Sequence, residues 1–308
     1  MNSNKFIQDN HKYWDWNGLK IFWSVVNESN KIPILLLHGF GASSAHWRNN
    51  ISVFAKNGYA VYSMDLLGFG KSAQPGIKQI GKLDNGIWCD QVTDFINEII
   101  RPVNNNKIVI IGNSLGGLIA LTCGVAISEE ISGIIASPLP DPVTLKIEKG
   151  KYNSFKIKLI EIFISLIPIK VILFFINRFG IIEFCLKSAY WKKDQIDNEL
   201  LEIVTKPTLR DTASRSLRAM CLGMTVRSYK LKASYLLAKL SKIKKVPFLL
   251  IWGEKDNFIP LFYGERVAKL YPWVELKIIA NSGHCVHDED HYKFNKMSHE
   301  WIKGLKTF

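Results

Sequence analysis

Residues 107–117 (KIVIIGNSLGG) constrain the fold more than any other part of the sequence. They begin with a continuous β-branched run, which is typical of a central strand covered on both faces. The run passes directly into a G-x-S-x-G pattern at 112–116 and then into small residues that we expect to form a helix to about Ile127. Glycines are needed two residues either side of Ser114, because side chains there would collide with neighbouring backbone in a tight strand-to-helix turn. The pattern therefore predicts a nucleophilic serine at the end of a strand.

The rest of the chain alternates short apolar runs with amphipathic stretches, and no internal repeat interrupts them. This alternation predicts an α/β fold in which helices wrap both faces of a mostly parallel sheet. Near the start, Asn17-Gly18 suits the two-residue turn of an antiparallel β-hairpin. Further strands are expected at 34–37, 60–64, 107–112, 131–136, 247–252 and 275–280. Helices are expected at 45–56, at 87–100, after Ser114 and from about Asp288 onward.

The domain organisation follows from a stretch of about a hundred residues that contains no strand pattern. Residues 139–244 look helical and lie between two core strands, which predicts a cap inserted over the functional edge of the sheet. The core is then expected at 13–138 and 245–308, with residues 1–12 as a flexible polar tail. A chain of 308 residues is long enough for one such domain.

Charge and cysteine content limit the partners and cofactors. The formal net charge of +13 fits attraction to an anionic membrane surface, but it also fits a compositional bias with scattered lysines. No arginine-rich run or stacked aromatic-basic motif suggests nucleic acid. The five cysteines form no CxxC pair and no zinc spacing, so we expect no metal, no organic cofactor and a reducing, cytoplasmic compartment. No secretory signal pattern is visible at the N-terminus.

A serine nucleophile needs a base, and the base needs an acid to orient it. Asp256 follows the strand predicted at 247–252, and His284 follows the strand predicted at 275–280, so that both side chains reach the same sheet edge as Ser114. We therefore predict Ser114 as nucleophile, His284 as base and Asp256 as acid. Glu254 and Asp141 are alternatives for the acid, and His287 and His291 for the base, although both of these histidines are expected to be solvated surface residues.

The negative charge that develops on the attacked carbonyl requires amide donors. The backbone amide of Leu115, at the start of the helix, and that of Phe40, in the sequence HGFG at 38–41, are the expected pair. Asp65, in the sequence DLLGFGKS at 65–72, is expected to structure its loop rather than to transfer protons.

The motifs HGFG, DLLGFGKS, GNSLGG, WGEKDNFIP and NSGHCVHDED together resemble the α/β-hydrolase superfamily across nearly the whole chain. This resemblance implies the α/β-hydrolase fold, with a mostly parallel sheet, an N-terminal antiparallel hairpin and an inserted helical cap. Residues 36–75 and the GNSLGG form are similar to cyanobacterial and plastid hydrolases that include pheophytinase and chlorophyll dephytylase. Haloalkane dehalogenases and epoxide hydrolases also resemble the pattern, but they place an aspartate where this chain has Ser114.

The cap contains an unusually apolar segment at 155–176. A transmembrane helix is not expected there, because its longest uncharged stretch, 162–169, is far shorter than the ~20 residues that a span needs. The segment fits a cap helix buried on the core. It also fits an apolar mouth for a lipid-like substrate, resting on a membrane with Lys156, Lys158 and Lys170 near headgroups. Trp191, Met220 and Met224 are candidates to line the pocket, although such residues in helices more often belong to the core.

These expectations define a serine hydrolase that cleaves a carboxylic ester with a hydrophobic acyl or alcohol part. The subgroup resemblance implies a phytyl ester of a chlorophyll-type pigment as one substrate. Two other functions fit the same sequence, since fold and triad do not determine the reaction. One is C–C bond hydrolysis or cofactor-free perhydrolysis by the same residues. The other is a non-catalytic binding scaffold, although a scaffold has no physical need for nucleophile, base and acid together.

Overall fold

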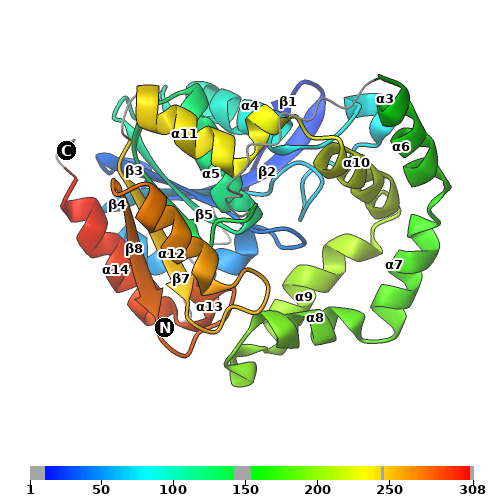
Figure 1. The fold of residues 1–308 in the computed structure, drawn as a ribbon. Helices are drawn as coiled ribbons and strands as arrows, with labels where there is room; N and C mark the ends of the chain where they lie inside the picture. Colours follow the sequence, from blue (N-terminus) through cyan, green and yellow to red (C-terminus); the bar gives the residue numbers. More distant parts are fainter. Residues whose placement is uncertain (1–10, 142–153, 244–245, 306–308) are drawn as a thin grey trace.

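The computed structural model describes residues 11–141, 154–243 and 246–305. Its core is an eight-stranded sheet in the order β1-β2-β4-β3-β5-β6-β7-β8 (Figure 1). β1 pairs antiparallel with β2, β2 pairs antiparallel with β4, and all other neighbours are parallel. The strands are β1 His11–Trp16, β2 Leu19–Val26, β3 Ile32–Leu37, β4 Tyr59–Met64, β5 Ile108–Asn113, β6 Ile131–Ser137, β7 Phe248–Gly253 and β8 Val274–Ile279.

The predicted strands and the predicted hairpin are confirmed. Asn17 and Gly18 join β1 to β2 with φ of 54° and 77°, the left-handed backbone that a two-residue turn of this type requires. The mixed sheet with surrounding helices is the expected α/β-hydrolase fold. Of the predicted flexible tail, His11 and Lys12 instead belong to β1, and residues 1–10 lie outside the described part of the chain.

Alternate residues of the central strands enter two separate hydrophobic clusters, one on each face of the sheet. Leu35 and Ile110 belong to the cluster that packs against α4, α5 and α11, while Ile34 and Val109 belong to the cluster that packs against α2 and α14. This two-sided burial explains why the strand sequences are apolar throughout rather than alternating. The core helices are α2 Ile51–Lys56, α3 Ile77–Ile80, α4 Asn85–Phe95 with a π-helical extension Ile96–Ile100, α5 Leu115–Ala126, α11 Ala233–Ile243, α12 Leu261–Leu270, α13 Val286–Glu289 and α14 His291–Lys303.

Between β6 and β7 the described chain is helical, as predicted for the cap. In Figure 1, α6 and α7 lie at the side of the molecule away from the sheet, α10 lies between them and the core, and α8 lies beside α9. The division at 139 and 244 remains a prediction, and Leu236, Leu237 and Leu240 of α11 join the core cluster beneath the cap. The segments are α6 Ser154–Leu166, α7 Ile169–Arg178, α8 Ile181–Ala189, α9 Asn198–Thr205 and α10 Ala213–Thr225, with short 3₁₀ turns at Lys193–Gln195, Lys206–Leu209 and Tyr229–Leu231.

The helix predicted at 45–56 is instead divided into a 3₁₀ turn, Ser44–Trp47, and α2. Asn50 lies at the break, with its side chain fully buried and donating to the carbonyl of His287 and to Asn295 Oδ1 at 2.8 and 2.7 Å. These long-range hydrogen bonds tie the break to the C-terminal part of the core. The last helix also begins later than predicted, because Asp288 lies in the short α13 and Asp290 precedes α14.

Candidate active site

Ser114 lies at a sharp turn between β5 and α5, with φ of 50° and ψ of −112°. This backbone conformation is strained for a residue with a side chain and persists only where its surroundings enforce it. A Cβ atom on Gly112 would overlap the backbone of Gly116, and one on Gly116 would overlap the carbonyl of Leu37. The glycines are therefore required by close backbone approach, which is the reason that the sequence pattern predicts.

Asp256 and His284 follow β7 and β8, and their side chains meet in a buried pair. His284 Nδ1 lies 3.0 Å from Asp256 Oδ2 and 3.2 Å from Oδ1. Asp256 is itself held by the backbone amides of Phe258 and Ile259, which donate to Oδ1 at 2.8 and 2.9 Å. Because an ionised carboxylate only accepts hydrogen bonds, Nδ1 carries the proton and Nε2 is the basic nitrogen.

The histidine loop lies directly beside the serine turn. Asn113, the residue before Ser114, donates from Nδ2 to the carbonyl of Ser137 at 2.6 Å and reaches the carbonyl of His284 at 3.5 Å. Among the described residues, Ser114 Oγ has no hydrogen bond to His284. Rotation about the Cα–Cβ bond of Ser114 moves this hydroxyl. Hydrogen bonds between a catalytic serine and its base are often long in the absence of substrate and tighten when substrate binds.

The loop after β3 contacts the serine turn from the other side. A Cβ on Gly39 would lie 2.5 Å from Asn113 Oδ1 and 3.5 Å from the Cβ of Ser114, so the HGFG backbone approaches closely only because residue 39 is glycine. Phe40 follows it, with its side chain more than half exposed and its ring against Phe69. The amide of Phe40 and that of Leu115, the first residue of α5, thus belong to the two segments that flank Ser114.

His38 is a positioning residue that the sequence analysis missed. It is fully buried, its Nδ1 lies 2.8 Å from the carbonyl of Gly39, and its Nε2 accepts from the amide of Leu66 at 3.0 Å. Burial lowers the pKa of His38 despite the nearby carboxylate of Asp65. A neutral ring with its proton on Nδ1 satisfies both contacts, so His38 links the loop after β3 to the loop after β4. Its place directly after an apolar strand, in HGFG, was the available signal.

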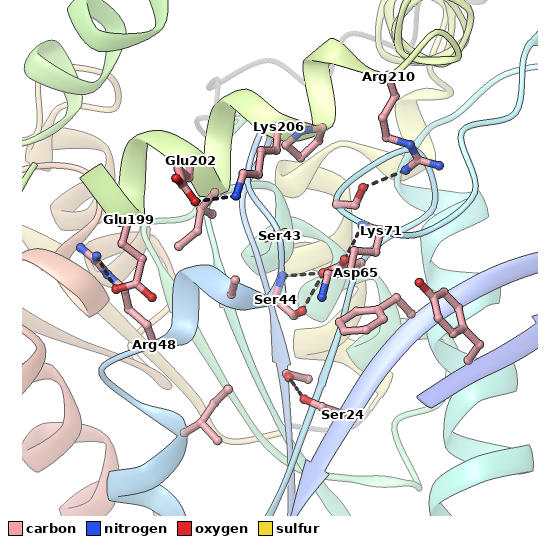
Figure 2. Close-up of a pocket in the computed structure, with 18 residues that line it drawn as sticks. Ser24, Ser43, Ser44, Arg48, Asp65, Lys71, Glu199, Glu202, Lys206 and Arg210 are labelled. Carbon is pink, nitrogen blue, oxygen red and sulfur yellow. Dashed lines mark hydrogen bonds and ion pairs between the residues drawn. The ribbon is translucent and has the colours of Figure 1, made fainter. Parts of the chain in front are cut away.

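Asp65 structures its loop, as expected. Oδ1 accepts from the amide and hydroxyl of Ser44 at 2.7 and 2.6 Å, and Oδ2 accepts from the amide of Lys71 at 2.7 Å (Figure 2). Gly70, whose Cβ would overlap the Asp65 carboxylate, lets the loop close over it. Both carboxylate oxygens thus accept hydrogen bonds from Ser44 or from the loop itself, which is a structural role.

The end of the cap's α8 is hydrogen bonded to the histidine loop. The carbonyl of Ala189 accepts from the amide of His284 at 2.7 Å. The carboxylate of Glu289 accepts from the amides of Gly283 and Lys192 at 2.8 and 2.6 Å and so joins the same two segments. Burial raises the pKa of Glu289, although these amide donors act in the opposite direction.

A buried polar network next to this junction fastens the cap to the core. Tyr190 donates its hydroxyl proton to Asp288 at 2.8 Å, and His46 Nε2 lies 2.8 Å from the same hydroxyl oxygen. Arg48 donates to Asp288 from Nε at 2.9 Å and to Asp197 of the cap at 2.6 Å. Burial alone would raise the pKa of Asp288, but His46 and Arg48 outweigh it and lower that pKa to about 2.

The rival acids have other structural partners. Glu254 is exposed and caps the amide of Asn281 at 3.1 Å, which, with Lys255, lowers its pKa. Asp141 forms an ion pair with Arg227 at 3.1 Å.

The rival bases have other surroundings. His287 is fully buried, so its predicted surface position is wrong, and neither of its ring nitrogens has a hydrogen-bond partner among the described residues. Its ring packs between His46 and Trp47, and burial lowers its pKa well below the usual value. His291 is half-buried, with Nδ1 3.3 Å from the carbonyl of Asp288.

The three predicted pocket residues occupy different environments. Met220 is buried in the core cluster, with its terminal methyl against Gly68. Met224 packs on the same cluster from α10. Trp191 is about half exposed beside the histidine loop, with the ammonium of Lys255 5.8 Å from its ring centre.

A cavity of about 810 Å³ lies between α9 and the loops that follow β3 and β4. Figure 2 shows its charged lining: Arg48, Lys71 and Asp65 come from the core side, and Glu202 and Lys206 come from the cap. Ser114, Asp256 and His284 are not among its lining residues. Within the described residues, no group of three or more His, Cys, Asp or Glu side chains is arranged to hold a metal ion.

The sequence and fold are similar to those of known hydrolases. The model of the alpha/beta hydrolase family matches residues 34–296, and the chain therefore belongs to that family. It is similar to Epoxide hydrolase 4 of Homo sapiens, with 27% identity over 294 residues, which cover 93% of this chain and 76% of the human protein. A 2-hydroxy-6-oxononadienedioate/2-hydroxy-6-oxononatrienedioate hydrolase of Burkholderia vietnamiensis is 21% identical over 303 residues, covering 94% and 93% of the two chains.

Solved structures share the fold at low sequence identity. A thermophilic esterase from Thermogutta terrifontis matches with a TM-score of 0.71 and 20% identity, over 96% of this chain and 99% of the esterase. A meta-cleavage product hydrolase from Pseudomonas fluorescens matches with a TM-score of 0.70 and 18% identity, over 96% and 98% of the two chains. With the family match over residues 34–296, these structures agree that the protein is an alpha/beta hydrolase.

Proposed function

We propose that the protein is a serine hydrolase that cleaves a carboxylic ester with a hydrophobic acyl or alcohol part. The observation that carries the proposal is the strained backbone of Ser114, on a turn where Gly112 and Gly116 allow close backbone approach. This turn lies beside the loop of the buried His284–Asp256 pair. A fold that only bound ligands would gain nothing from keeping a serine in this conformation.

In this mechanism Ser114 Oγ attacks the ester carbonyl while His284 Nε2 takes its proton. The resulting oxyanion accepts hydrogen bonds from the amides of Phe40 and Leu115. His284 then returns the proton to the departing alcohol, which leaves an acyl group on Ser114. A water molecule, deprotonated by the same Nε2, attacks the acyl group, and His284 returns this proton to Ser114 Oγ as the bond to serine breaks and the acid leaves. Asp256 stabilises the imidazolium each time it forms.

A fluorophosphonate probe, which phosphonylates activated serines, tests this assignment. Wild-type protein is expected to be labelled, Ser114→Ala to be unlabelled and His284→Ala to be labelled at least a hundredfold more slowly. Ser282→Ala is the matched control, because this serine is buried two residues from His284 and its hydroxyl has no hydrogen-bond partner in the part of the chain that the structure describes. Labelling that survives in folded Ser114→Ala would refute the nucleophile, and an unlabelled but folded wild type would favour the binding scaffold.

C–C bond hydrolysis is the second candidate reaction, and its support is the names of two similar proteins. Besides the Burkholderia protein, a 2-hydroxy-6-oxo-6-(2'-aminophenyl)hexa-2,4-dienoic acid hydrolase of Metapseudomonas resinovorans is 36% identical over 107 residues, a third of this chain. Cofactor-free perhydrolysis would use the same triad. The similarity to Epoxide hydrolase 4 would suggest epoxide hydrolysis. We do not propose this reaction, because Ser114 occupies the position where epoxide hydrolases are expected to have aspartate.

Substrate comparison ranks these reactions. We expect p-nitrophenyl esters of increasing chain length to be hydrolysed with a kcat/KM that rises with acyl length. A 2-hydroxy-6-oxo-dienoate turned over with a higher kcat/KM than any ester would reverse the ranking. Phytyl esters of chlorophyll-type pigments should be assayed in the same series, because residues 36–75 resemble the pheophytinase group.

A further inference from the structure

The cap carries a concentration of large apolar side chains on the outside of the protein. Eleven residues of α6, α7, α8 and the turn between α7 and α8 are exposed, and the most exposed are Leu166, Phe184 and Phe163 at 75%, 70% and 69%. Solvent-exposed apolar residues are common singly, but a contiguous group of this kind marks an interaction surface. We call the group the apolar arm: Leu159, Ile162, Phe163, Leu166, Val171, Ile172, Phe174, Phe175, Phe179, Ile181 and Phe184.

The geometry of α6 shows that the arm is not a poorly packed core face. Leu159, Ile162, Phe163 and Leu166 recur at i, i+3, i+4 and i+7, so they form one stripe along the helix. The opposite side of α6 already packs on α10, where buried Ile164 contacts a cluster that includes Leu222 and Val226. The helix therefore has two apolar stripes, of which one is satisfied within the molecule.

The next helix repeats this arrangement. In α7, Ile169 and Leu173 are buried against Ala213 of α10, while the other side presents Phe174, Phe175 and their neighbours to solvent. In Figure 1, α6 and α7 form the outer edge of the molecule, with α10 between them and the core. No single described helix has the length and composition to cross a membrane, and Lys158–Leu166 with Ile169–Arg178 has both only as a pair bent by 47°.

The charges around the arm favour an anionic partner. Between 158 and 187 there are four basic and two acidic residues. Within the described chain, Lys158, Lys170 and Arg178 have no ion-pair partner, whereas Lys187 pairs with Glu183 at 2.7 Å. A second copy of this chain, with a net charge of +13, would bring the same cations face to face. An anionic lipid surface instead offers acyl chains to the phenylalanines and headgroups to the cations.

We propose that the apolar arm docks the protein on anionic bilayers, lying in the interface plane with its phenylalanines inserted at the boundary between headgroups and acyl chains. Docking would hold the cap, and with it the loop of His284, at the surface of the membrane. The inference stands on the exposure and charge of the arm and does not depend on the reaction proposed for Ser114.

Co-sedimentation with vesicles tests the docking. Wild-type protein is expected to bind vesicles of phosphatidylcholine with 30% phosphatidylglycerol at least tenfold more tightly than pure phosphatidylcholine. The triple variant Phe163→Ser, Phe174→Ser, Phe179→Ser should lose at least tenfold in affinity. The matched control is Val103→Ser, Phe262→Ser, Tyr292→Ser, at residues that are similarly exposed outside the arm. Its affinity for the same vesicles should be within twofold of that of wild type.

Two further variants separate this inference from its rivals. Lys158→Gln, Lys170→Gln, Arg178→Gln should lose the preference for phosphatidylglycerol, and Ser114→Ala should bind vesicles like wild type whether or not the protein hydrolyses esters. Circular dichroism shows that each variant is folded. Equal vesicle binding by wild type and the phenylalanine variant would overturn the proposal. A lipid-free dimer in light scattering that this variant dissociates would overturn it in favour of self-association.

Discussion

Lowering the pH from 7 to 4 should destabilise the protein through one buried histidine. The ring of His46 is almost fully buried; its Nε2 is hydrogen bonded to the Tyr190 hydroxyl, and its Nδ1 has no partner within residues 11–141, 154–243 and 246–305. Because Tyr190 gives its own proton to Asp288, the neutral ring carries its hydrogen on Nε2. Burial lowers the pKa of His46 to about 4, even though Asp288, 3.9 Å away, favours the protonated form.

The size of the effect follows from this pKa. In the unfolded chain a histidine titrates near pH ~6.5, so between 6.5 and 4 the unfolded state binds a proton that the native state does not. The contribution to the free energy of unfolding is therefore fully present above pH ~6.5 and is lost as the pH falls to about 4. At 1.36 kcal/mol per unit, the shift of about 2.5 units corresponds to a loss of about 3 kcal/mol. His287, whose pKa is also lowered by burial, adds to the loss in the same direction.

Urea unfolding followed by circular dichroism at pH 7, 6, 5 and 4 measures this loss. His46→Gln keeps a donor for Tyr190 but cannot titrate, so its free energy of unfolding should fall by about 3 kcal/mol less than that of wild type. His291→Gln, at a half-buried histidine of α14, should keep the wild-type pH dependence. Parallel pH profiles for wild type and His46→Gln would refute the assignment of the acid sensitivity to His46.

Three further outcomes are expected. Asp256→Asn should fold normally but react with the fluorophosphonate probe about 10³ to 10⁴ times more slowly, because the histidine loses its correct tautomer; labelling within tenfold of wild type would contradict its role. Gly116→Ala, whose methyl group would overlap the carbonyl of Leu37, should lower the free energy of unfolding by more than about 3 kcal/mol or prevent folding. Gly76→Ala, whose added methyl group would have its nearest contact at 3.4 Å, should lower it by less than about 1 kcal/mol. Tyr190→Phe should lower the free energy of unfolding by about 1–3 kcal/mol in urea, and an unchanged midpoint would show that the buried hydroxyl contributes nothing.

The strands of the sheet and the sharp turn at Ser114 could be predicted because they depend on local sequence. A β-branched run followed by a glycine-walled serine encodes a strand, a turn and a helix within ten residues. Asp256 and His284 could be placed because each follows a parallel strand, and the carboxyl ends of parallel strands meet at one edge of the sheet. The backbone angles of Ser114 and the contact between His284 and Asp256 agree with these expectations.

What the sequence did not predict depends on contacts between distant segments. The hydrogen bond of His46 with Tyr190 joins residues 144 positions apart, and no periodic pattern identifies such partners. His287 stands among charged residues at the start of a short helix, which suggests exposure, but that helix packs beneath His46 and Trp47. His38 has no partner near it in sequence except its own loop, so its role in joining two loops required coordinates.

The hydrogen bond from the amide of His284 to the carbonyl of Ala189 has a consequence for engineering. Substrate range in a capped enzyme is most simply changed by grafting a foreign cap between the same two core strands. Here such a graft would also remove the carbonyl of Ala189, which accepts from the backbone amide of His284, the proposed base. A chimera that retains residues 189–192 of the original chain should therefore keep its reactivity toward inhibitors. A chimera in which the foreign cap also replaces residues 189–192 should bind new molecules but turn them over poorly.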